Sequence, residues 1–216
     1  MSRNKELKHQ RMRGYFIEAT NLIIQSDGIE GITTRRVAEQ AGYNVSTLYN
    51  YFDNVDHLIA LSLTSHIGVY IEAIIKRLKG VTDPYKLYQG LWLEFVEHAF
   101  REPVVYYYMF FKNTDRDVSE VFEAYFSEYP DKLKLLDSSL QVMFFEKHIY
   151  LRDMRFLETS FPNHDKLELE RISDINIMVY RSMLQDLQGI TNEKEQNKYI
   201  KKYETYFSFL TQSLQA

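Results

Sequence analysis

Helical periodicity runs along the whole sequence. Apolar residues recur three or four positions apart, and we find no alternating segment long enough to build a sheet. Gly80, Pro84, Pro103, Pro130 and Pro162 interrupt the pattern. The expected helices cover about 4 or 8 to 26, 54–79, 84–101, 103–112, 115–128, 131–160, 166–188 and 192–214. The pattern therefore predicts an all-α fold.

Two short helical patterns lie between residues 32 and 52, in the stretch ITTRRVAEQAGYNVSTLYNYF. Thr33 or Thr34 is suited to cap the first helix, which turns Val37 and Ala38 inward. We expect Gly42 to end it, because glycine adopts a left-handed conformation without steric cost.

The second short helix is expected to begin after Asn44, a residue suited to cap it. Its apolar stripe consists of Val45, Leu48 and Phe52. The exposed positions carry Ser46, Thr47, Tyr49 and Asn50. Such side chains form hydrogen bonds, and a single helix fits the major groove of DNA. The pattern therefore predicts a helix-turn-helix with a DNA-reading second helix.

These residues resemble the TetR family of bacterial transcriptional regulators over about residues 13–61. The resemblance rests on the spacer 28–34, the AxxAG turn at 38–42 and the TLYxYF sequence at 47–52. Val45 and Ser46 depart from it, since the family often has lysine and glycine there. Val55 also lies where the family carries a lysine, so phosphate-seeking lysines are missing.

The resemblance implies a homodimeric, DNA-binding regulator. An N-terminal three-helix bundle is followed by a larger effector-binding and dimerisation domain, and a repressor is favoured over an activator. Its partners are a double-stranded DNA operator and a small, hydrophobic or aromatic effector. The residues implied to approach DNA are Thr34, Arg35, Arg36, Tyr43, Asn44, Ser46, Thr47, Tyr49 and Asn50.

The chain divides into three expected segments. Residues 1–53 form the DNA-binding domain, 54–79 a connecting helix, and 80–216 the second domain. The first thirteen residues contain Arg3, Lys5, Lys8, Arg11 and Arg13. We expect a mobile basic arm there, which either follows a phosphate backbone or only solubilises the terminus.

Composition narrows the class of protein. Of 216 residues, 45% are hydrophobic and 26% charged, as in an ordinary globular protein. The net charge of -4 argues against a generally basic nucleic-acid-coating protein. The absence of cysteine excludes disulfides and thiolate metal sites. No apolar run approaches about 20 residues and no signal segment occurs, so we expect a cytoplasmic protein.

Aromatic residues are concentrated between residues 92 and 156. A bulky core explains most of them. The resemblance additionally implies an effector pocket in this region. Its candidate lining residues are Trp92, Phe95, Tyr107, Phe111, Tyr125 and Phe145.

The last two helical patterns carry apolar residues over a wide face. Either these faces pack within one chain, or, as the resemblance implies, they join two copies in a four-helix interface. The candidate interface residues are Ile172, Ile175, Met178, Tyr203, Phe207 and Leu210.

Catalysis is not indicated. The histidines are scattered, and neither H-E-x-x-H nor G-x-S-x-G occurs. We therefore expect no enzyme, cofactor or metal; a metal-sensing site at His98 with Glu94 or Glu97 is a remote alternative. Two other functions stay open: an effector-independent DNA-bound structural or cell-division factor of the same fold, and a helical protein-binding module.

Overall fold

The computed structural model describes residues 3–112 and 118–215, with side chains placed for 8–111 and 118–215. Throughout these ranges the chain forms helices, turns and loops, without a β-strand. The predicted all-α fold is confirmed. The contacts between Cα atoms divide the chain into two units, Met1–His66 and Ile67–Ala216.

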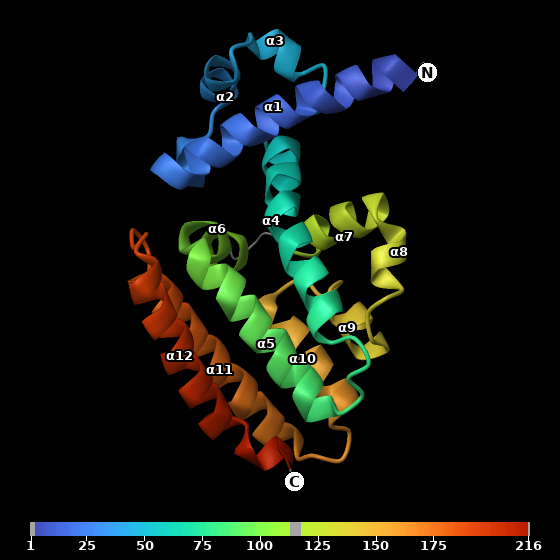
Figure 1. Cartoon of the computed structure of the whole chain (residues 1–216), viewed down its shortest axis with the longest axis vertical. Helices are drawn as coiled ribbons and strands as arrows, with labels where there is room; N and C mark the ends of the chain where they lie inside the picture. Colours follow the sequence, from blue (N-terminus) through green and yellow to red (C-terminus); the bar gives the residue numbers. More distant parts are fainter. Residues whose placement is uncertain (1–2, 113–117, 216) are drawn as a thin grey trace. The chain divides into compact units, whose positions relative to one another are not determined.

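The first unit is a small helical bundle around α1 (Figure 1). The side chains of Phe16, Ile23, Val37 and Leu48 are almost completely buried in its core. Its elements are α1 (Arg3–Asp27), η1 (Ile29–Gly31), α2 (Thr34–Ala41), α3 (Val45–Leu48) and the first turns of α4 (Val55–Arg77).

The turn between α2 and α3 follows the expected signals. The Thr33 hydroxyl caps α2 by accepting the backbone N–H of Arg36 at 3.2 Å. Gly42 adopts a left-handed conformation, with φ of 77°. The backbone N–H of Tyr43 then donates to the carbonyl oxygen of Ala38 at 2.8 Å. Short-range chemistry therefore sets this turn.

The reading helix is shorter than predicted. We expected it to continue to Phe52, whereas α3 ends at Leu48. The chain then tightens: Asn50 N–H donates to the Thr47 carbonyl oxygen and Tyr51 N–H to that of Leu48, each three residues back. These bonds are typical of a tight final turn.

The expected mobile arm is wrong for the described part of the terminus. Helix α1 already begins at Arg3, so the basic residues up to Arg13 lie on a helix. The side chains of Arg3 and Lys5 lie outside the described residues. Arg13 is half-buried, and its guanidinium carbon lies 5.8 Å from the ring centre of Phe52.

Helix α4 contributes to both units. The boundary between the units falls after His66, inside the predicted connecting helix 54–79. By length and composition alone, α4 is also apolar enough to cross a membrane, with a mean hydropathy of 1.7. An 18-residue window of α4 is thus more apolar than we expected, but 44% of that window is buried inside the protein, and one such helix is weak evidence for a membrane span.

The second unit surrounds α5, which contacts α6, α10, α11 and α12 (Figure 1). Helices α11 and α12 lie side by side. The elements are α5 (Pro84–Arg101), α6 (Pro103–Tyr107), the π-helical turn η2 (Tyr108–Lys112), α7 (Ser119–Glu128), α8 (Pro130–Leu133), α9 (Ser138–Met143), α10 (Ile149–Ser160), α11 (Lys166–Asp186), α12 (Glu193–Leu210) and η3 (Gln212–Gln215).

The predicted single helix 131–160 is three helices, α8, α9 and α10. Asp137 starts α9 by accepting the backbone N–H of Ser139 at 2.9 Å. His148 precedes α10 in an extended conformation. An aspartate cap competes with helix continuation, which apolar spacing alone does not reveal.

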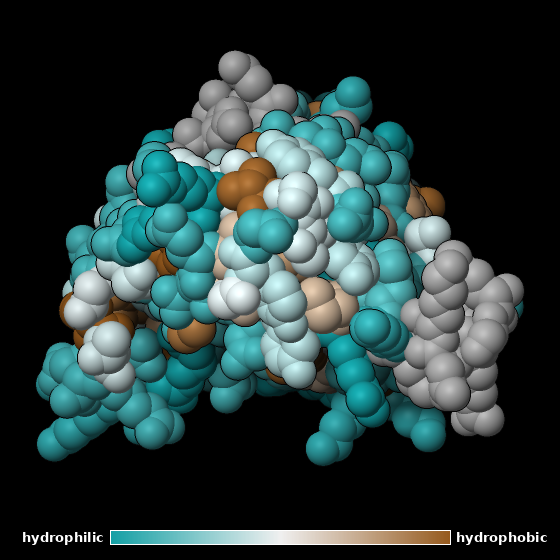
Figure 2. Space-filling view, turned by 90° about the horizontal axis from the view of Figure 1, so that it is seen from above, coloured by the Kyte–Doolittle hydropathy of each residue, from teal (hydrophilic) through white to brown (hydrophobic). Residues whose placement is uncertain are grey.

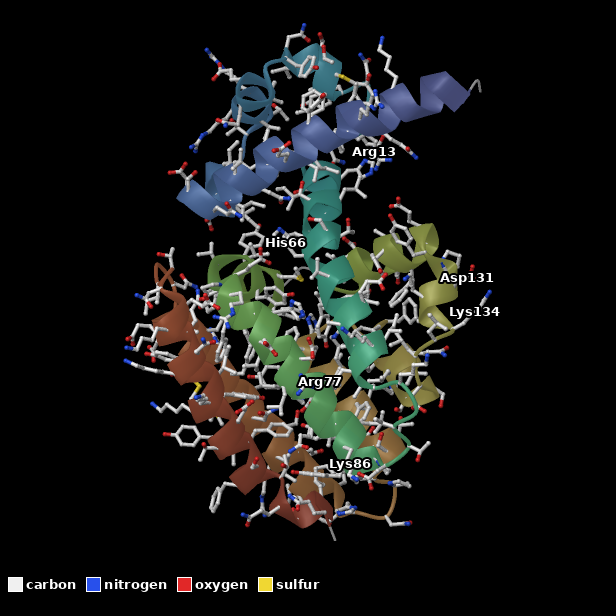
Figure 3. All side chains as sticks on the ribbon, viewed as in Figure 1. Arg13, His66, Arg77, Lys86, Asp131 and Lys134 are labelled. Carbon is white, nitrogen blue, oxygen red and sulfur yellow. The ribbon has the colours of Figure 1, made fainter. Side chains whose placement is uncertain are left out.

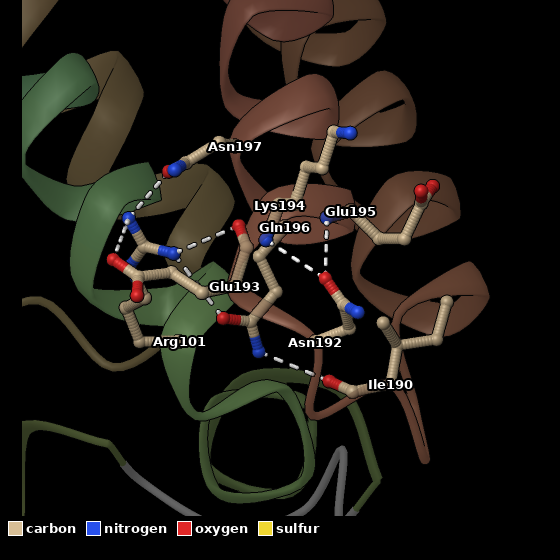
Figure 4. Close-up of polar contacts among 8 residues, drawn as sticks. All are labelled: Arg101, Ile190, Asn192, Glu193, Lys194, Glu195, Gln196 and Asn197. Atoms are coloured by element: carbon tan, nitrogen blue, oxygen red, sulfur yellow. Dashed lines mark hydrogen bonds and ion pairs between the residues drawn. The ribbon is translucent and has the colours of Figure 1, made fainter.

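Polar contacts tie α5 to its neighbours. Arg101 donates to the side-chain oxygens of Gln196 at 3.2 Å and Asn197 at 2.5 Å, on the first turns of α12 (Figure 4). Arg77, on the last turn of α4 (Figure 3), lies 2.7 Å from Glu94 on α5. These contacts connect α5 to α12 and to the end of α4.

A buried carboxylate joins α10 to α5. Asp153 is 3% exposed. It accepts hydrogen bonds from the indole Nε1 of Trp92 at 2.7 Å and the hydroxyl of Tyr88 at 3.1 Å. Burial raises the pKa of Asp153 to about 6, and its interactions with Ser173, Trp92 and Tyr88 only partly offset that rise.

Gly42→Ala should destabilise the first unit by about 1 kcal/mol, because an alanine in the left-handed region carries a steric penalty. Gly14→Ala is the matched control. Gly14 lies within α1, and an added methyl group there meets no described atom within 4 Å. It should stabilise by about 0.5–1 kcal/mol. Urea unfolding followed by circular dichroism measures both, and equal effects would refute this account of the turn.

Asp153→Asn should flatten the pH dependence of unfolding. A carboxyl with a raised folded pKa stabilises the protonated native state at low pH, and that stability is lost as pH rises from 3.8 to about 6. The loss in the wild type, relative to the variant, is roughly 3 kcal/mol. Urea titrations at pH 4, 5, 6 and 7 measure it. Asp174→Asn, at an exposed position, controls for charge; parallel curves for wild type and Asp153→Asn would contradict the prediction.

Candidate DNA-binding surface and core cavity

The buried and exposed sides of the α3 region are sharply different. Leu48 is completely buried, whereas Tyr49 is 52% exposed. Ser46 and Asn50 are exposed as well. The surface seen from above, on the side of α2 and α3, is largely hydrophilic (Figure 2). The segment therefore presents hydrogen-bonding side chains to solvent while Leu48 anchors it.

Asn44 organises the start of α3. Its side-chain oxygen accepts the backbone N–H of Thr47 at 2.8 Å, the Thr47 hydroxyl at 2.8 Å and the Ser46 hydroxyl at 2.7 Å. These bonds fix the two hydroxyls near the helix start and leave their lone pairs as acceptors. The predicted contact residues Asn44, Ser46 and Thr47 are thus brought together.

The two arginines of α2 have different surroundings. Arg35 is highly exposed and forms a 2.9 Å ion pair with Glu39 on the same helix. Such a surface pair is weak and exchanges readily for a phosphate. Arg36 instead binds the Asp27 carboxylate and the carbonyl oxygen of Gly31, and the hydrogen bond from Arg36 lowers the pKa of Asp27. Arg36 therefore holds α2 against the end of α1.

Aromatic contacts support the surface from α1. The ring of Tyr43 lies 6.3 Å from Tyr15 and 5.5 Å from Phe16, between ring centres. Tyr51 lies 4.7 Å from the ring of His9. The contribution of Tyr15, His9 and Tyr51 to this surface was not predicted from the sequence. A signal was available for His9, because it lies seven residues before Phe16 and therefore on the same face of α1.

The predicted DNA-contact residues therefore fall into three groups. Tyr43, Tyr49 and Asn50 are exposed around α3, together with the Asn44 cluster. Arg35 is exposed on α2, and Thr34 is half-buried at its start. Arg36 forms the third group, because its side chain already binds Asp27 and the carbonyl oxygen of Gly31 within the first unit.

A cavity of about 30 Å³ lies inside the second unit. That volume accommodates a water molecule, but it is far below the roughly 300 Å³ typical of ligand pockets. Helices α4, α5, α9 and α10 and the turn η2 enclose it. Its lining residues are Tyr70, Leu91, Trp92, Phe95, Phe110, Met143, Ile149, Arg152 and Asp153.

Trp92 and Phe95, two of the predicted pocket residues, line this cavity, and four others do not. Tyr107 accepts a hydrogen bond from Gln185 on α11. Phe111 packs against Tyr180, and Tyr125 packs against Gly68 and Tyr129. Phe145 is 40% exposed. These four residues lie elsewhere in the unit, because aromatic composition does not specify the direction of a side chain.

Sequence analysis also missed Arg152 and Asp153, both almost completely buried. Both fall one helical turn from Ile149 or Phe156, on the side of α10 where apolar residues recur. Charged residues at such positions are uncommon. That spacing was the signal that could have identified them.

The face formed by α11 and α12 retains exposed apolar side chains. Ile175 is 43% exposed and Met178 55%, and Leu210 is half-buried. Of the other interface candidates, Ile172, Tyr203 and Phe207 are buried in their own protomer, so they are not available to a second copy. Additional exposed residues on this face are Leu167, Tyr206 and Phe209, the last 75% exposed.

The metal-sensing alternative gains nothing from the geometry. His98 Nε2 lies 3.2 Å from a Glu94 oxygen. Within the described ranges, no group of three or more His, Cys, Asp or Glu residues is placed to hold a metal ion.

Known proteins are similar to this chain in the region of the helix-turn-helix. Residues 16–60 fit the family model described as bacterial regulatory proteins, tetR family. The HTH-type transcriptional regulator PksA of Bacillus subtilis is 34% identical over 59 residues, which are 27% of this chain. The match spans 29% of the length of that relative.

Solved structures share the fold along nearly the whole chain. A transcriptional regulator of Aquifex aeolicus superposes with a TM-score of 0.55 and 17% identity, covering 92% of this chain and 99% of its own. A TetR-family regulator of Streptomyces coelicolor gives 0.51 and 12%, covering 94% and 98%. Residues 16–60 therefore match the TetR family of bacterial regulatory proteins, and the chain as a whole is similar in its all-helical fold to solved TetR-family regulators.

Proposed function

We propose that this protein is a homodimeric transcriptional repressor, working in the cytoplasm, that leaves its DNA operator when a small effector binds the second unit. The observation that carries the proposal is the α3 region, where a buried Leu48 and a capping Asn44 present Tyr49 and Asn50 to solvent. The match of residues 16–60 to a regulator family supports the same function.

Contacts to DNA divide by chemistry. Tyr43, Ser46, Thr47 and Asn50 supply donors and acceptors for base edges or the adjacent sugar-phosphate. Tyr49 and Thr34 are assigned to phosphates. Arg35 adds a cation to the phosphate backbone, whereas Arg36 serves the bundle.

Helix α4 is the element through which the effector would act. It contributes residues to both units, so a ligand that prefers one conformation of the second unit biases the position of α4. An effector with equal affinity for both conformations would change nothing.

A second copy is the proposed occupant of the α11–α12 face. A groove of about 480 Å³, lined in part by Ile175, Val179, Tyr206, Phe209 and Leu210, runs along it. Large exposed apolar side chains gathered on one face are typical of an interface. A two-fold dimer also provides the paired reading helices that a symmetric operator requires.

Tyr49→Ala should weaken operator binding by about tenfold or more, because a lost contact costs about 1–3 kcal/mol. Fluorescence anisotropy measures it, on DNA from upstream of the gene and on scrambled DNA of equal length, across a salt series. Tyr150→Ala is the matched control, since Tyr150 is an exposed tyrosine of the second unit.

Equal, weak binding of the wild type to both DNAs, after a search of the remaining genome, would favour a DNA-bound structural factor. Absence of salt-dependent DNA binding would favour a protein-binding module. A selective operator complex that ignores every effector tested would support the effector-independent alternative.

Phe209→Glu should convert the dimer to a monomer at micromolar concentration, because it places a charge in the apolar face. Size-exclusion chromatography with light scattering measures the mass. Leu135→Glu is the control: Leu135 is 63% exposed and lies outside α11 and α12. A wild-type mass equal to one chain would refute the dimer, as would a dimeric Phe209→Glu variant.

A further inference from the structure

Arg152 is an unusual residue for the wall of an apolar cavity. It is 5% exposed and lines the cavity with Tyr70, Trp92, Phe95 and Phe110. Burying a charged group is unfavourable unless an opposite charge or a full set of hydrogen bonds compensates it. The surroundings of its guanidinium group therefore indicate what it is suited to bind.

Protein groups compensate the guanidinium only in part. It lies 3.8 Å from the ring centre of Phe122 and 5.1 Å from that of Phe144. One of its N–H groups donates to the Phe144 carbonyl oxygen at 3.1 Å. Among the described residues, no carboxylate lies within ion-pair distance of Arg152. A guanidinium has several further donors, arranged to fit a planar carboxylate.

Asp153, the next residue along α10, does not supply a carboxylate for Arg152. Asp153 also lines the cavity, but its two oxygens accept the hydrogen bonds of Trp92 and Tyr88. A cationic ligand would therefore find an aspartate that is already engaged and would face the charge of Arg152. An anion would instead meet Arg152, which forms no ion pair with any described residue and is influenced by the charge of Glu146 only at longer range.

One hydroxyl of the cavity lining, that of Tyr70, points to the same ligand chemistry. Tyr70 lines the cavity, and burial raises its pKa well above the ordinary value, so its hydroxyl stays protonated and can donate. The rings of Tyr106 and Tyr180 lie 5.6 and 5.1 Å from that of Phe95. Their buried hydroxyls make no hydrogen bond within the described structure. Tyr106 and Tyr180 do not line the cavity, so a ligand would reach their hydroxyls only after the cavity enlarges past Phe95.

We propose that this cavity binds a small organic anion, with a carboxylate held by Arg152 and an apolar body among Trp92, Phe95 and Phe110. The proposal rests on the proposed function, because it names the chemical class of its effector. The cavity must enlarge to admit such a molecule. Met143 is flexible, and Phe110 belongs to the π-helical turn η2, a geometry often found at functional sites.

The sole tryptophan of the sequence lines the cavity, so its fluorescence reports occupancy directly. The probes are benzoate and octanoate, compared with the neutral molecules benzyl alcohol and 1-octanol. The full-length wild type should show saturable changes in Trp92 emission, with at least one carboxylate bound about tenfold or more tightly than its alcohol.

Arg152→Met keeps the bulk of the side chain and removes the charge, so it should abolish the preference for the carboxylate. Arg155→Met is the matched control, because Arg155 is exposed on the same helix and pairs with Glu146. Circular dichroism checks that each variant folds. Phe110→Ala enlarges the cavity and keeps Arg152, so it should retain the preference for each carboxylate over its alcohol. This variant keeps the proposal testable if Arg152→Met does not fold.

Equal affinity of the wild type for acids and alcohols would overturn the proposal, as would a preference that survives in Arg152→Met. It would also be overturned if neither acid changed Trp92 emission in the wild type or in Phe110→Ala. Operator binding, measured separately by anisotropy, distinguishes the two failures. Selective DNA binding without anion binding refutes only the ligand class, whereas anion binding without DNA binding refutes only the regulator.

Discussion

The buried carboxylate of Asp153 sets the arrangement inside the second unit. Its partners, Tyr88 and Trp92, lie one turn apart on α5, so the two hydrogen bonds fix both the position and the rotation of α10. Successive residues of a helix point about 100° apart. Holding Asp153 against α5 therefore directs Arg152 towards the rings of Phe122 and Phe144. This one buried interaction therefore helps to place Arg152 at the cavity wall, where it forms no ion pair with any described residue.

The DNA-reading region could be predicted from sequence because its signals are local. Thr33, Gly42 and Asn44 act within a few residues of their own positions, and the structure places each in the expected role. The end of α3 could not be predicted in the same way. The apolar spacing of Leu48 and Phe52 fits a continuous helix, but the backbone tightens between them. Periodicity indicates which residues are buried, but it does not distinguish a continuous α-helix from a tighter turn that buries the same residues.

The second unit was predictable in class but not in detail. Its helices follow from periodicity and proline, yet neither the family resemblance nor the abundance of aromatic residues specifies which of them line a pocket. Trp92 and Phe95 line the cavity because α5 is central, whereas Tyr107 and Phe145 lie towards other surroundings. Tyr203 was assigned to an interface, but its hydroxyl donates to buried Asn176 at 2.7 Å. Such choices depend on partners distant in sequence, which a single sequence does not provide.

The brevity of α3 limits how much genetic information one protomer can read. A helix of four residues with a tight turn after it brings few side chains within reach of base edges. A reading helix of this kind distinguishes roughly three or four base pairs. A DNA sequence of three or four base pairs recurs by chance many times in a genome, which offers on the order of 10⁶ competing sites. Under the proposed function, a DNA site unique enough for one promoter therefore requires two reading helices, one from each copy of the chain.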